Sequence, residues 1–420
     1  MTRTLDVYLF NNLVGRLVQD DGGQMVFAYT ESWLNRPGAM PLSHSLPLLP
    51  KRFRNKECRG FFAGILPEEA KREIIARNLG ISARNDYAML ERIGGECAGA
   101  VTFMPAGQPL PEDHWDYRTL TPQELAAIIR ELPTRPLLAG DEGIRLSLAG
   151  AQDKVAVRIE GNDIRLPLGN APSTHILKPA VARFEGVVYN EALCMTLAAA
   201  LGLPTAPVEI RSVDGMDYLL VERYDRHHHR PGPDGRPALE RLHQEDFCQA
   251  QDIVPDRKYQ KEGGPSLKDC FALLREVSSA PVVDLARLLD AVIYNWLVGN
   301  NDAHGKNFSL LYTGGGPEDI ETRLSPLYDI VCTVYYPDLS REMAMKIGDQ
   351  YSSERVTPKD FEKLADEAGL AKPLVRRRVP ELAEILLERL PKIDTPNAAS
   401  EQVAVLIRKR SEKAIETFRT

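Results

Sequence analysis

Apolar and polar residues alternate along the first part of the chain in a way that is typical of short antiparallel strands. The alternation covers residues 5–30 and is broken by Asn11-Asn12 and by Asp21-Gly22-Gly23, which favour turns. Helical spacing follows at 66–80 and 86–95, where apolar residues recur three and four apart and each run ends at glycine. The first hundred residues are therefore predicted to form a small mixed unit.

A second strand-rich stretch runs from residue 144 to residue 225. A helix is predicted just before it, because Thr121, Pro122 and Glu124 supply an N-cap, a first-turn proline and the acid of a capping box. Strands are predicted at 154–159, 163–166 and 174–178, followed by one helix that ends at Gly202 and by a hairpin over 207–225. This pattern predicts a sheet that carries one helix.

Helical periodicity dominates the rest of the chain, after a stretch at 226–242 that we expect to be an exposed loop. An apolar stripe at positions 285, 288, 289, 292, 293, 296 and 297 is wide enough for a buried helix. Further helices are predicted to begin at Thr357 and to cover 401–418. The sequence therefore predicts a strand-rich lobe followed by a helical lobe.

Composition excludes several classes of protein. The 420 residues are too many for one ordinary core, and a net charge of -7 gives no general attraction for nucleic acid or anionic lipid. The six cysteines lie far apart with no CxxC pair, so neither a zinc ribbon nor a dense disulfide framework is indicated. No apolar run approaches the ~20 residues that span a bilayer, so we expect a cytoplasmic protein without membrane contact.

The most informative motif is the polar segment NNDAHGKN at 300–307, directly after the predicted buried helix. Phosphoryl transfer needs a carboxylate to orient and deprotonate the acceptor hydroxyl, and oxygen ligands for magnesium. Asp302 suits the catalytic base, whereas Asn307 and the later Asp329 suit the metal. The competing interpretation is an ordinary turn, because Asn and Asp favour turns.

The kinase interpretation also demands a phosphate-binding lysine and a hinge upstream. Lys178 ends a predicted strand, and Glu191 in the first turn of the next helix is a candidate partner, although an acid there also complements the helix dipole. Glu222 and Tyr224 end the hairpin at the point where a kinase hinge would offer backbone groups to adenine. The alternative is that these residues belong to a plain sheet.

Eight motifs in a fixed order resemble the HipA toxin kinases: RLSLAGAQDK, THILKP, YNEALC, LLVERYDR, HQEDFCQ, KYQKEGGPSL, NNDAHGKNFSLL and LSPLYDI. The resemblance extends to PLSHSLPL, FFAGILPEE and LERIGGECAGAVTF, and so covers nearly the whole chain. It implies an α+β, bilobal protein-kinase-like fold related to the phosphatidylinositol kinases. The implied domains are a mixed N-terminal HipA subdomain at 1–108, a kinase N-lobe at 109–225 and a helical C-lobe at 226–420.

The resemblance also implies an ATP- and Mg²⁺-dependent serine/threonine protein kinase. Asp302 would be its catalytic base, and Asn307 and Asp329 its metal ligands. Ser147 matches the serine that such kinases phosphorylate on themselves, which silences the enzyme. The residues implied to bind ATP are Ala149, Gly150, Ala151, Gln152, Asp153, Lys154, Lys178, Glu222, Arg223, Tyr224, His304, Gly305, Lys306, Asn307, Tyr328 and Asp329.

Partners follow from the same resemblance. The chain would be the toxin of a type II toxin-antitoxin pair that phosphorylates an aminoacyl-tRNA synthetase, such as glutamyl-tRNA synthetase, inhibiting translation and promoting growth arrest and persistence. It would act as a corepressor with a small helix-turn-helix antitoxin of HipB type. Operator DNA would be reached mainly through the antitoxin, because the stretch at 346–360 offers few basic residues.

Two other functions stay open on the residues alone. The residues of the catalytic loop do not indicate which acceptor is phosphorylated, so a small-molecule or lipid kinase of the same fold is one alternative. A non-catalytic repressor subunit is the other.

Two basic or metal-binding motifs are expected to be solvated surface. The adjacent histidines at 227–229 point in different directions and stand among Arg, Pro and Gly, which favours a loop over a metal site. We expect the basic run at 51–56 to lie on a solvated surface, because short basic runs usually do.

Overall fold

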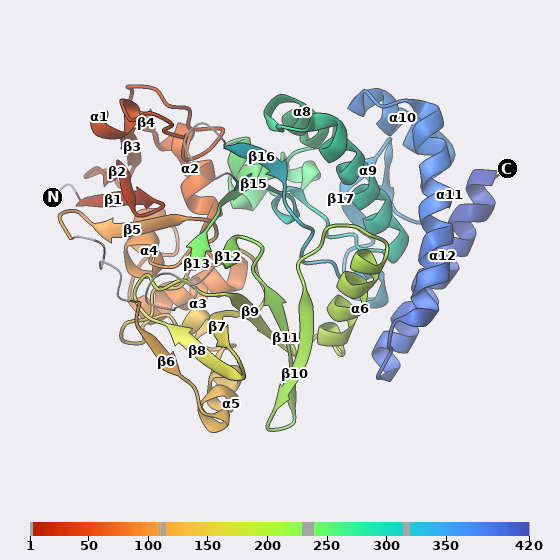
Figure 1. The fold of residues 1–420 in the computed structure, drawn as a ribbon, viewed down its shortest axis with the longest axis horizontal. Coiled ribbons are helices and arrows are strands. Elements are labelled where there is room, and N and C mark those ends of the chain that lie inside the picture. The colour runs from red at the N-terminus through yellow and green to blue at the C-terminus, as the bar shows by residue number, and fades with distance from the viewer. Residues whose placement is uncertain (1–2, 109, 111–114, 229–238, 314–319, 420) are drawn as a thin grey trace. The chain divides into compact units, whose positions relative to one another are not determined.

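The protein is described by a computed structural model, which covers residues 3–108, 110, 115–228, 239–313 and 320–419 (Figure 1). The chain divides into two compact units. Unit 1 contains residues 1–179, 211–255 and 311–321, and unit 2 contains residues 180–210, 256–310 and 322–420. Each unit is therefore assembled from segments that are far apart in sequence, and the division into domains at 108 and 225 stays a prediction.

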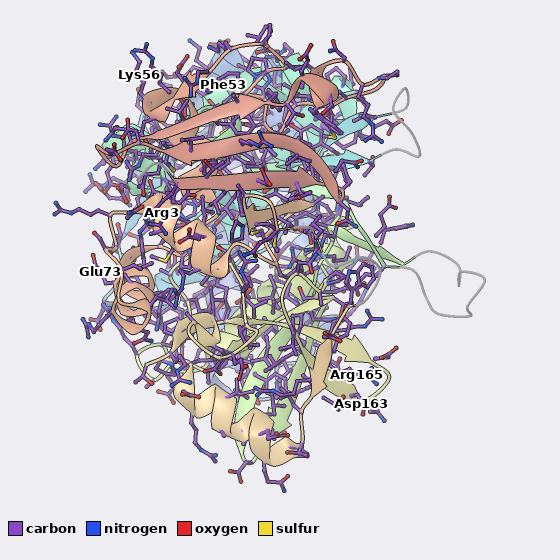
Figure 2. The ribbon with its side chains drawn as sticks, turned by 90° about the vertical axis from the view of Figure 1, so that its left-hand side faces the viewer. Arg3, Phe53, Lys56, Glu73, Asp163 and Arg165 are labelled. Atoms are coloured by element: carbon purple, nitrogen blue, oxygen red, sulfur yellow. The ribbon has the colours of Figure 1, made fainter. Side chains whose placement is uncertain are left out.

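Unit 1 begins with a five-stranded antiparallel sheet in the order β4-β3-β2-β1-β5. Its strands are β1 (Arg3–Leu9), β2 (Asn12–Gln19), β3 (Met25–Tyr29), β4 (Phe53–Arg54) and β5 (Val101–Pro105). Strand β1 pairs antiparallel with β2, and β2 with β3, which confirms the predicted meander. Burial alternates strictly only along β3. Figure 2 shows this sheet with Phe53 on β4 and Lys56 at the surface.

The helices of this part of the chain are α1 (Glu31–Leu34), α2 (Asn55–Gly64), α3 (Glu69–Leu79), α4 (Asp86–Ile93) and α5 (Pro122–Glu131). The sequence predicts α3, α4 and α5, whereas α1 and α2 were not predicted. Helix α3 begins three residues later than the apolar pattern, because Pro67 forms a strand-like bridge with Gly150. The capping box of Thr121 and Glu124 at the start of α5 is confirmed.

The second sheet has six strands in the order β10-β11-β9-β7-β8-β6. These are β6 (Tyr117–Thr119), β7 (Val155–Glu160), β8 (Asp163–Pro167), β9 (His175–Pro179), β10 (Val208–Val213) and β11 (Met216–Glu222). All the strands of the sequence prediction are present. Helix α6 (Val187–Ala200) follows β9 in the chain and belongs to unit 2. Because α6 starts at Val187, Glu191 lies in its second turn, so its placement in the first turn was wrong.

The prediction of an exposed loop at 226–242 is wrong in the part that the structure describes. Strands β12 (Arg226–His228) and β13 (Leu239–Arg241) pair there, and Arg226 is buried. Arg226 is buried because it forms an ion pair with Glu96. Glu96 lies far away in the sequence, so this pairing leaves no periodic pattern. His229 lies outside the described residues, so the expectation for the three histidines stays untested. Next come β14 (His243–Asp246) and α7 (Phe247–Ala250), with a three-stranded sheet ordered β14-β15-β16.

Unit 2 is mainly helical. Besides α6 it contains α8 (Leu267–Val277), α9 (Pro281–Val298), α10 (Pro358–Ala368), α11 (Lys372–Arg389) and α12 (Ala398–Arg419), of which α9, α11 and α12 pack side by side (Figure 1). Strands β15 (Ser309–Thr313) and β16 (Glu321–Leu324) each have residues in both units, and unit 2 also contains the hairpin of β17 (Glu342–Ile347) and β18 (Gln350–Ser352). The predicted apolar stripe of α9 is buried except at Leu285 and Trp296, which are half-buried. None of the helices described is long and apolar enough to cross a membrane.

Candidate active site

The loop that carries the predicted base leaves α9 abruptly. Gly299 ends the helix in the left-handed conformation, with φ of 77°, and its N–H donates to the carbonyl oxygens of Asn295 and Trp296. A Cβ atom at this position would lie 2.5 Å from Val334 Cγ2. Glycine is required both by the backbone conformation and by this close packing.

The loop then closes on the backbone of Asp302. The carbonyl oxygen of Asp302 accepts hydrogen bonds from His304 N–H at 2.8 Å and from Asn307 Nδ2 at 3.0 Å. The Asp302 N–H donates to Asn300 Oδ1 at 3.1 Å. The side chain of Asp302 is exposed to solvent. The structure thus brings the predicted base and the predicted metal amide together in one rigid turn.

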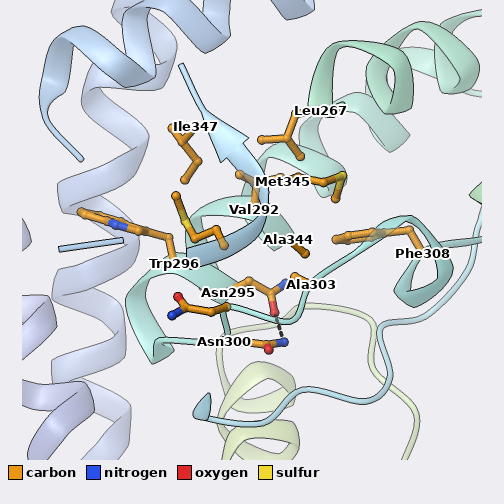
Figure 3. Close-up of a pocket in the computed structure, with 12 residues that line it drawn as sticks. Leu267, Val292, Asn295, Trp296, Asn300, Ala303, Phe308, Ala344, Met345 and Ile347 are labelled. Atoms are coloured by element: carbon orange, nitrogen blue, oxygen red, sulfur yellow. Dashed lines mark hydrogen bonds between the residues drawn. The ribbon is translucent and has the colours of Figure 1, made fainter. Parts of the chain in front are cut away.

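The back of this loop is packed against the interior of unit 2. Asn300 Nδ2 donates to Asn295 Oδ1 at 2.7 Å, and both residues line a small cavity of about 30 Å³ (Figure 3). Asn301 N–H donates to Thr333 Oγ1 at 2.8 Å, and Asn301 O accepts from Ala344 N–H at 2.7 Å. The loop is therefore anchored from behind while Asp302 faces water.

Tyr328 and Asp329 come from the segment after β16. The Tyr328 hydroxyl donates to Lys306 O at 2.8 Å and lies 2.7 Å from Ser309 Oγ. Asp329 follows with a left-handed backbone, at φ of 58°, a conformation that is uncommon outside glycine and clusters at functional sites. The segment is thus fastened to the catalytic loop through Tyr328.

The oxygen donors of these residues fit magnesium. A carboxylate and an amide oxygen are hard ligands, and magnesium in kinases is held by one or two such side chains together with phosphate and water. Because Asn307 Nδ2 is engaged by Asp302 O, the rotation of the Asn307 amide is fixed. Within the described part of the chain, no group of three or more His, Cys, Asp or Glu residues could hold a metal.

The predicted phosphate loop lies in unit 1. Lys154 Nζ donates to Ala149 O at 2.6 Å and so folds back over the loop. Gly150 has φ of +104°, and a Cβ atom there would lie 2.7 Å from Lys154 Nζ. Glycine at this position therefore permits both the backbone turn and the return of the lysine.

The phosphate loop is docked on the segment around α3. Gly150 O accepts from Glu68 N–H at 3.4 Å, and Asp153 forms a 2.5 Å ion pair with Lys71. Ser147 is fully buried, with its Oγ donating to Ile65 O at 3.0 Å. Lys71 and Ile65 could not be predicted from the sequence. Neither the ion pair of Lys71 with Asp153 nor the hydrogen bond of Ser147 to a backbone carbonyl oxygen leaves a local sequence pattern.

The predicted phosphate lysine and hinge lie on neighbouring strands. Lys178 on β9 is buried and stands opposite Leu219 on β11. Glu222 ends β11 opposite His175, and the backbone N–H of Arg223 donates to Thr174 O at 2.9 Å. The Tyr224 hydroxyl donates to Gln244 Oε1.

A buried charge network fixes the hinge from the side of the N-terminal sheet. Glu96 pairs with Arg223 at 2.9 Å, Arg226 at 2.8 Å and Arg241 at 2.5 Å, and Asp225 pairs with Arg223 at 2.8 Å. Burial alone would raise the pKa of Glu96, but the charges of Arg226, Arg241 and Arg223 outweigh it and hold the pKa at about 2. The side chain of Arg223 is thus engaged in the network, so a contact of Arg223 with adenine would come from its backbone.

The predicted site residues therefore fall into two groups, one in each unit. Unit 1 holds Ser147, the phosphate loop, Lys178 and the hinge, whereas unit 2 holds Asp302, His304 to Asn307, Tyr328 and Asp329. The convergence of the two groups on one triphosphate stays a prediction, as does the pairing of Lys178 with Glu191.

Comparisons with known proteins cover both units. Residues 146–390 match the family described as HipA-like C-terminal domain, and residues 5–104 match the HipA N-terminal domain. A putative kinase of Sinorhizobium fredii, Y4mE, is 48% identical over 93% of this chain and 92% of its own length. The serine/threonine-protein kinase toxin HipA of Shewanella oneidensis is 31% identical over 95% of this chain and 92% of its own length.

A solved structure agrees with these matches. The structure of HipA, HipB and operator DNA of the Shewanella oneidensis MR-1 toxin-antitoxin system includes a chain that superposes with a TM-score of 0.84, at 27% identity, over 99% of this chain and 98% of that one. The predicted α+β, kinase-like fold is thereby confirmed. Two family domains in the right order, two curated relatives and one structure agree, and the chain belongs to the HipA family.

Proposed function

We propose that the protein is an ATP- and magnesium-dependent serine/threonine protein kinase. The observation that supports this best is the 3.0 Å hydrogen bond from Asn307 Nδ2 to the carbonyl oxygen of Asp302. It joins a candidate base and a candidate metal ligand in one rigid loop, and positioning of this kind is the main contribution of a protein to phosphoryl transfer.

In this proposal Asp302 orients the acceptor hydroxyl and accepts its proton. Asn307 and Asp329 hold magnesium, which when bound neutralises charge on the phosphates. Lys178 and the loop from Ala149 to Lys154 hold the phosphates. The backbone of Glu222 to Tyr224 holds adenine, and the residues from His304 to Lys306 with Tyr328 line the nucleotide.

Transfer of label from radiolabelled ATP to protein tests the activity. Asp302→Asn and Asp329→Asn are each expected to lower the rate at least about a hundredfold, because each removes a carboxylate that the chemistry needs. Asp394→Asn is the matched control, since Asp394 is an exposed carboxylate of the same unit outside the loop. Full activity in both active-site variants would refute the assignment.

The biological role in the proposal is that of a type II toxin acting with a HipB-type antitoxin. The Shewanella oneidensis relative was solved with HipB and operator DNA, which supports a small DNA-binding partner and corepression for this chain as well. Expression of the wild-type chain, but not of Asp302→Asn, is expected to arrest growth, and the antitoxin encoded beside it is expected to restore growth.

The proposed substrate is an aminoacyl-tRNA synthetase, such as glutamyl-tRNA synthetase, whose phosphorylation inhibits translation and promotes persistence. Identification of the labelled species in a lysate tests this, because label in a metabolite or lipid would favour the alternative kinase. Absence of an ATP-dependent thermal shift with magnesium would favour the non-catalytic repressor subunit instead.

Autophosphorylation of Ser147 belongs to the same proposal. A phosphate there would add a dianion next to the loop that has to hold the phosphates of ATP, and so would silence the enzyme. Mass spectrometry of the chain after incubation with ATP, with Asp302→Asn as the inactive reference, tests it.

A further inference from the structure

Tyr259 contacts the predicted catalytic base directly. Its hydroxyl donates to Asp302 Oδ1 at 2.9 Å, and its ring meets the His304 ring edge to face, with the centroids 5.4 Å apart. Lys258 Nζ lies 5.4 Å from the centroid of the Tyr259 ring. A half-buried tyrosine is therefore held against the polar loop by a hydrogen bond and a ring contact, while Lys258 lies against the same ring, all within unit 2.

The segment that carries Tyr259 is fixed in place by its own turn. Tyr259 O accepts from the N–H groups of Glu262 and Gly264, both at 2.9 Å. A Cβ atom on Gly264 would lie 2.4 Å from Arg257 O, so the turn closes only with glycine. Gln260 Oε1 accepts from Lys346 N–H at 2.9 Å, which ties the turn to β17.

The hydroxyl adds a restraint on the side chain of Asp302. The three hydrogen bonds described above fix the backbone of Asp302. A donor to one carboxylate oxygen restrains the rotation of the carboxylate about Cβ–Cγ as well.

We propose that Tyr259 is a positioning residue of the kinase, whose hydroxyl sets the orientation of the Asp302 carboxylate. This inference rests on the proposed function. It adds a residue from a different segment, more than forty positions away, to the catalytic loop.

Tyr259→Phe is the decisive variant, because it removes only the hydroxyl and keeps the ring against His304 and Lys258. The rate of label transfer at saturating radiolabelled ATP is expected to fall about tenfold or more, the range for a lost hydrogen bond to a charged group, while KM for ATP stays within about twofold.

Tyr335→Phe is the matched control, since its hydroxyl donates to Gln402 Oε1 at 3.2 Å in the same unit and not to the loop. Wild-type rate in Tyr259→Phe would overturn the inference while leaving the proposed kinase intact. A fall in rate together with a rise in KM for ATP beyond about twofold would also overturn it, because a general structural disturbance of the site predicts that result.

A readout without turnover separates the inference from the proposed function. In full-length protein with ¹³Cγ-labelled aspartate, the signal of Asp302 is assigned by its loss in Asp302→Asn. Its chemical shift at one fixed pH is expected to differ between Tyr259→Phe and the wild type, because the variant lacks the donor to Asp302 Oδ1. An unchanged chemical shift would refute the role of the hydroxyl even if the protein transferred no phosphate, and the absence of all transfer by the wild type would refute the proposed function.

Discussion

Ser147 Oγ donates a 3.0 Å hydrogen bond to the carbonyl oxygen of Ile65, and no part of Ser147 is exposed to solvent. The serine is therefore a structural contact between the phosphate-loop segment and the N-terminal part of unit 1. A phosphate cannot be accommodated at this position without moving the segment, because a buried dianion beside a carbonyl oxygen is strongly unfavourable.

Ser147→Asp is accordingly expected to abolish ATP binding. The carboxylate would displace the segment and with it the Gly150 turn, whereas Ser147→Ala loses only a hydrogen bond worth about 1 kcal/mol of unfolding free energy and should still bind ATP. Thermal shift with ATP and magnesium measures both. Equal ATP-dependent shifts in the two variants would show that the segment does not respond to charge at 147.

Gly150→Ala is expected to weaken ATP binding through Lys154. The substitution imposes a strained backbone at φ of +104° and places a Cβ atom 2.7 Å from Lys154 Nζ, so the lysine has to leave its contact with Ala149 O. We expect KM for ATP to rise about tenfold, from the roughly 1–2 kcal/mol of strain and the displaced lysine.

Gly161→Ala is the control for backbone strain. Gly161 has φ of +60° and no atom within 4 Å of a built Cβ, and it lies in the same unit. Gly161→Ala is expected to lose about as much stability as Gly150→Ala but to keep the KM for ATP of the wild type. A similar rise in KM for ATP in both variants would rule out a specific role for Gly150.

Glu96→Gln is expected to destabilise unit 1 strongly. Removal of this charge takes away the acid that pairs with Arg223, Arg226 and Arg241, and leaves Asp225 as the acid beside the buried Arg223 and Arg226. Breaking one partner of a buried ionic network costs roughly 3–5 kcal/mol of unfolding free energy.

Urea unfolding measures this difference, with Glu240→Gln as control. Glu240 is an exposed acid on β13 next to Arg241, and its loss should cost less than about 0.5 kcal/mol. An equally small effect of Glu96→Gln would mean that the network contributes no net stability.

The parts of the fold that could be predicted are those in which the interacting residues are close in sequence. The capping box of Thr121 and Glu124 and the pairing of Asp302 with Asn307 join residues three and five positions apart, so the spacing itself carries the signal. The stripe on α9 likewise follows from helical periodicity.

The parts that could not be predicted depend on partners far apart in the chain. Glu96 and Arg226 are separated by 130 positions, and neither periodicity nor propensity connects them, so β12 and β13 were mistaken for a loop. Lys71 with Asp153 and Tyr259 with Asp302 are missed for the same reason. A single sequence gives the residue types at such a site but not which of them meet.

Glu245 makes the stability of unit 1 depend on pH. It is buried and accepts hydrogen bonds from Ser43 Oγ, from His44 N–H at 2.9 Å and from Tyr312 OH at 2.5 Å. Burial outweighs these donors and raises the pKa of Glu245 from 4.5 to about 7. The folded state therefore binds a proton more tightly than the unfolded state does.

The sign of the effect follows from this difference. Between pH 4.5 and about 7 the folded state carries more protons at Glu245 than the unfolded state, so the contribution of Glu245 to the unfolding free energy falls as pH rises, by on the order of 3 kcal/mol in total. His243 acts in the opposite direction, because burial lowers its pKa to about 4. The pH dependence of the unfolding free energy of the wild type therefore combines both effects. The difference in unfolding free energy between the wild type and a variant at position 245 isolates the effect of Glu245.

Glu245→Gln keeps the shape of the side chain and cannot titrate. Relative to the wild type, the variant is expected to gain unfolding free energy as pH rises from 5 to about 7 and to keep that gain up to pH 8, since only the wild type has to bury a carboxylate at the higher pH. Urea unfolding at several pH values measures the difference, with Glu142→Gln, an exposed acid of the same unit, as control. A difference between Glu245→Gln and the wild type that stays constant with pH would mean that Glu245 does not change its protonation over this range.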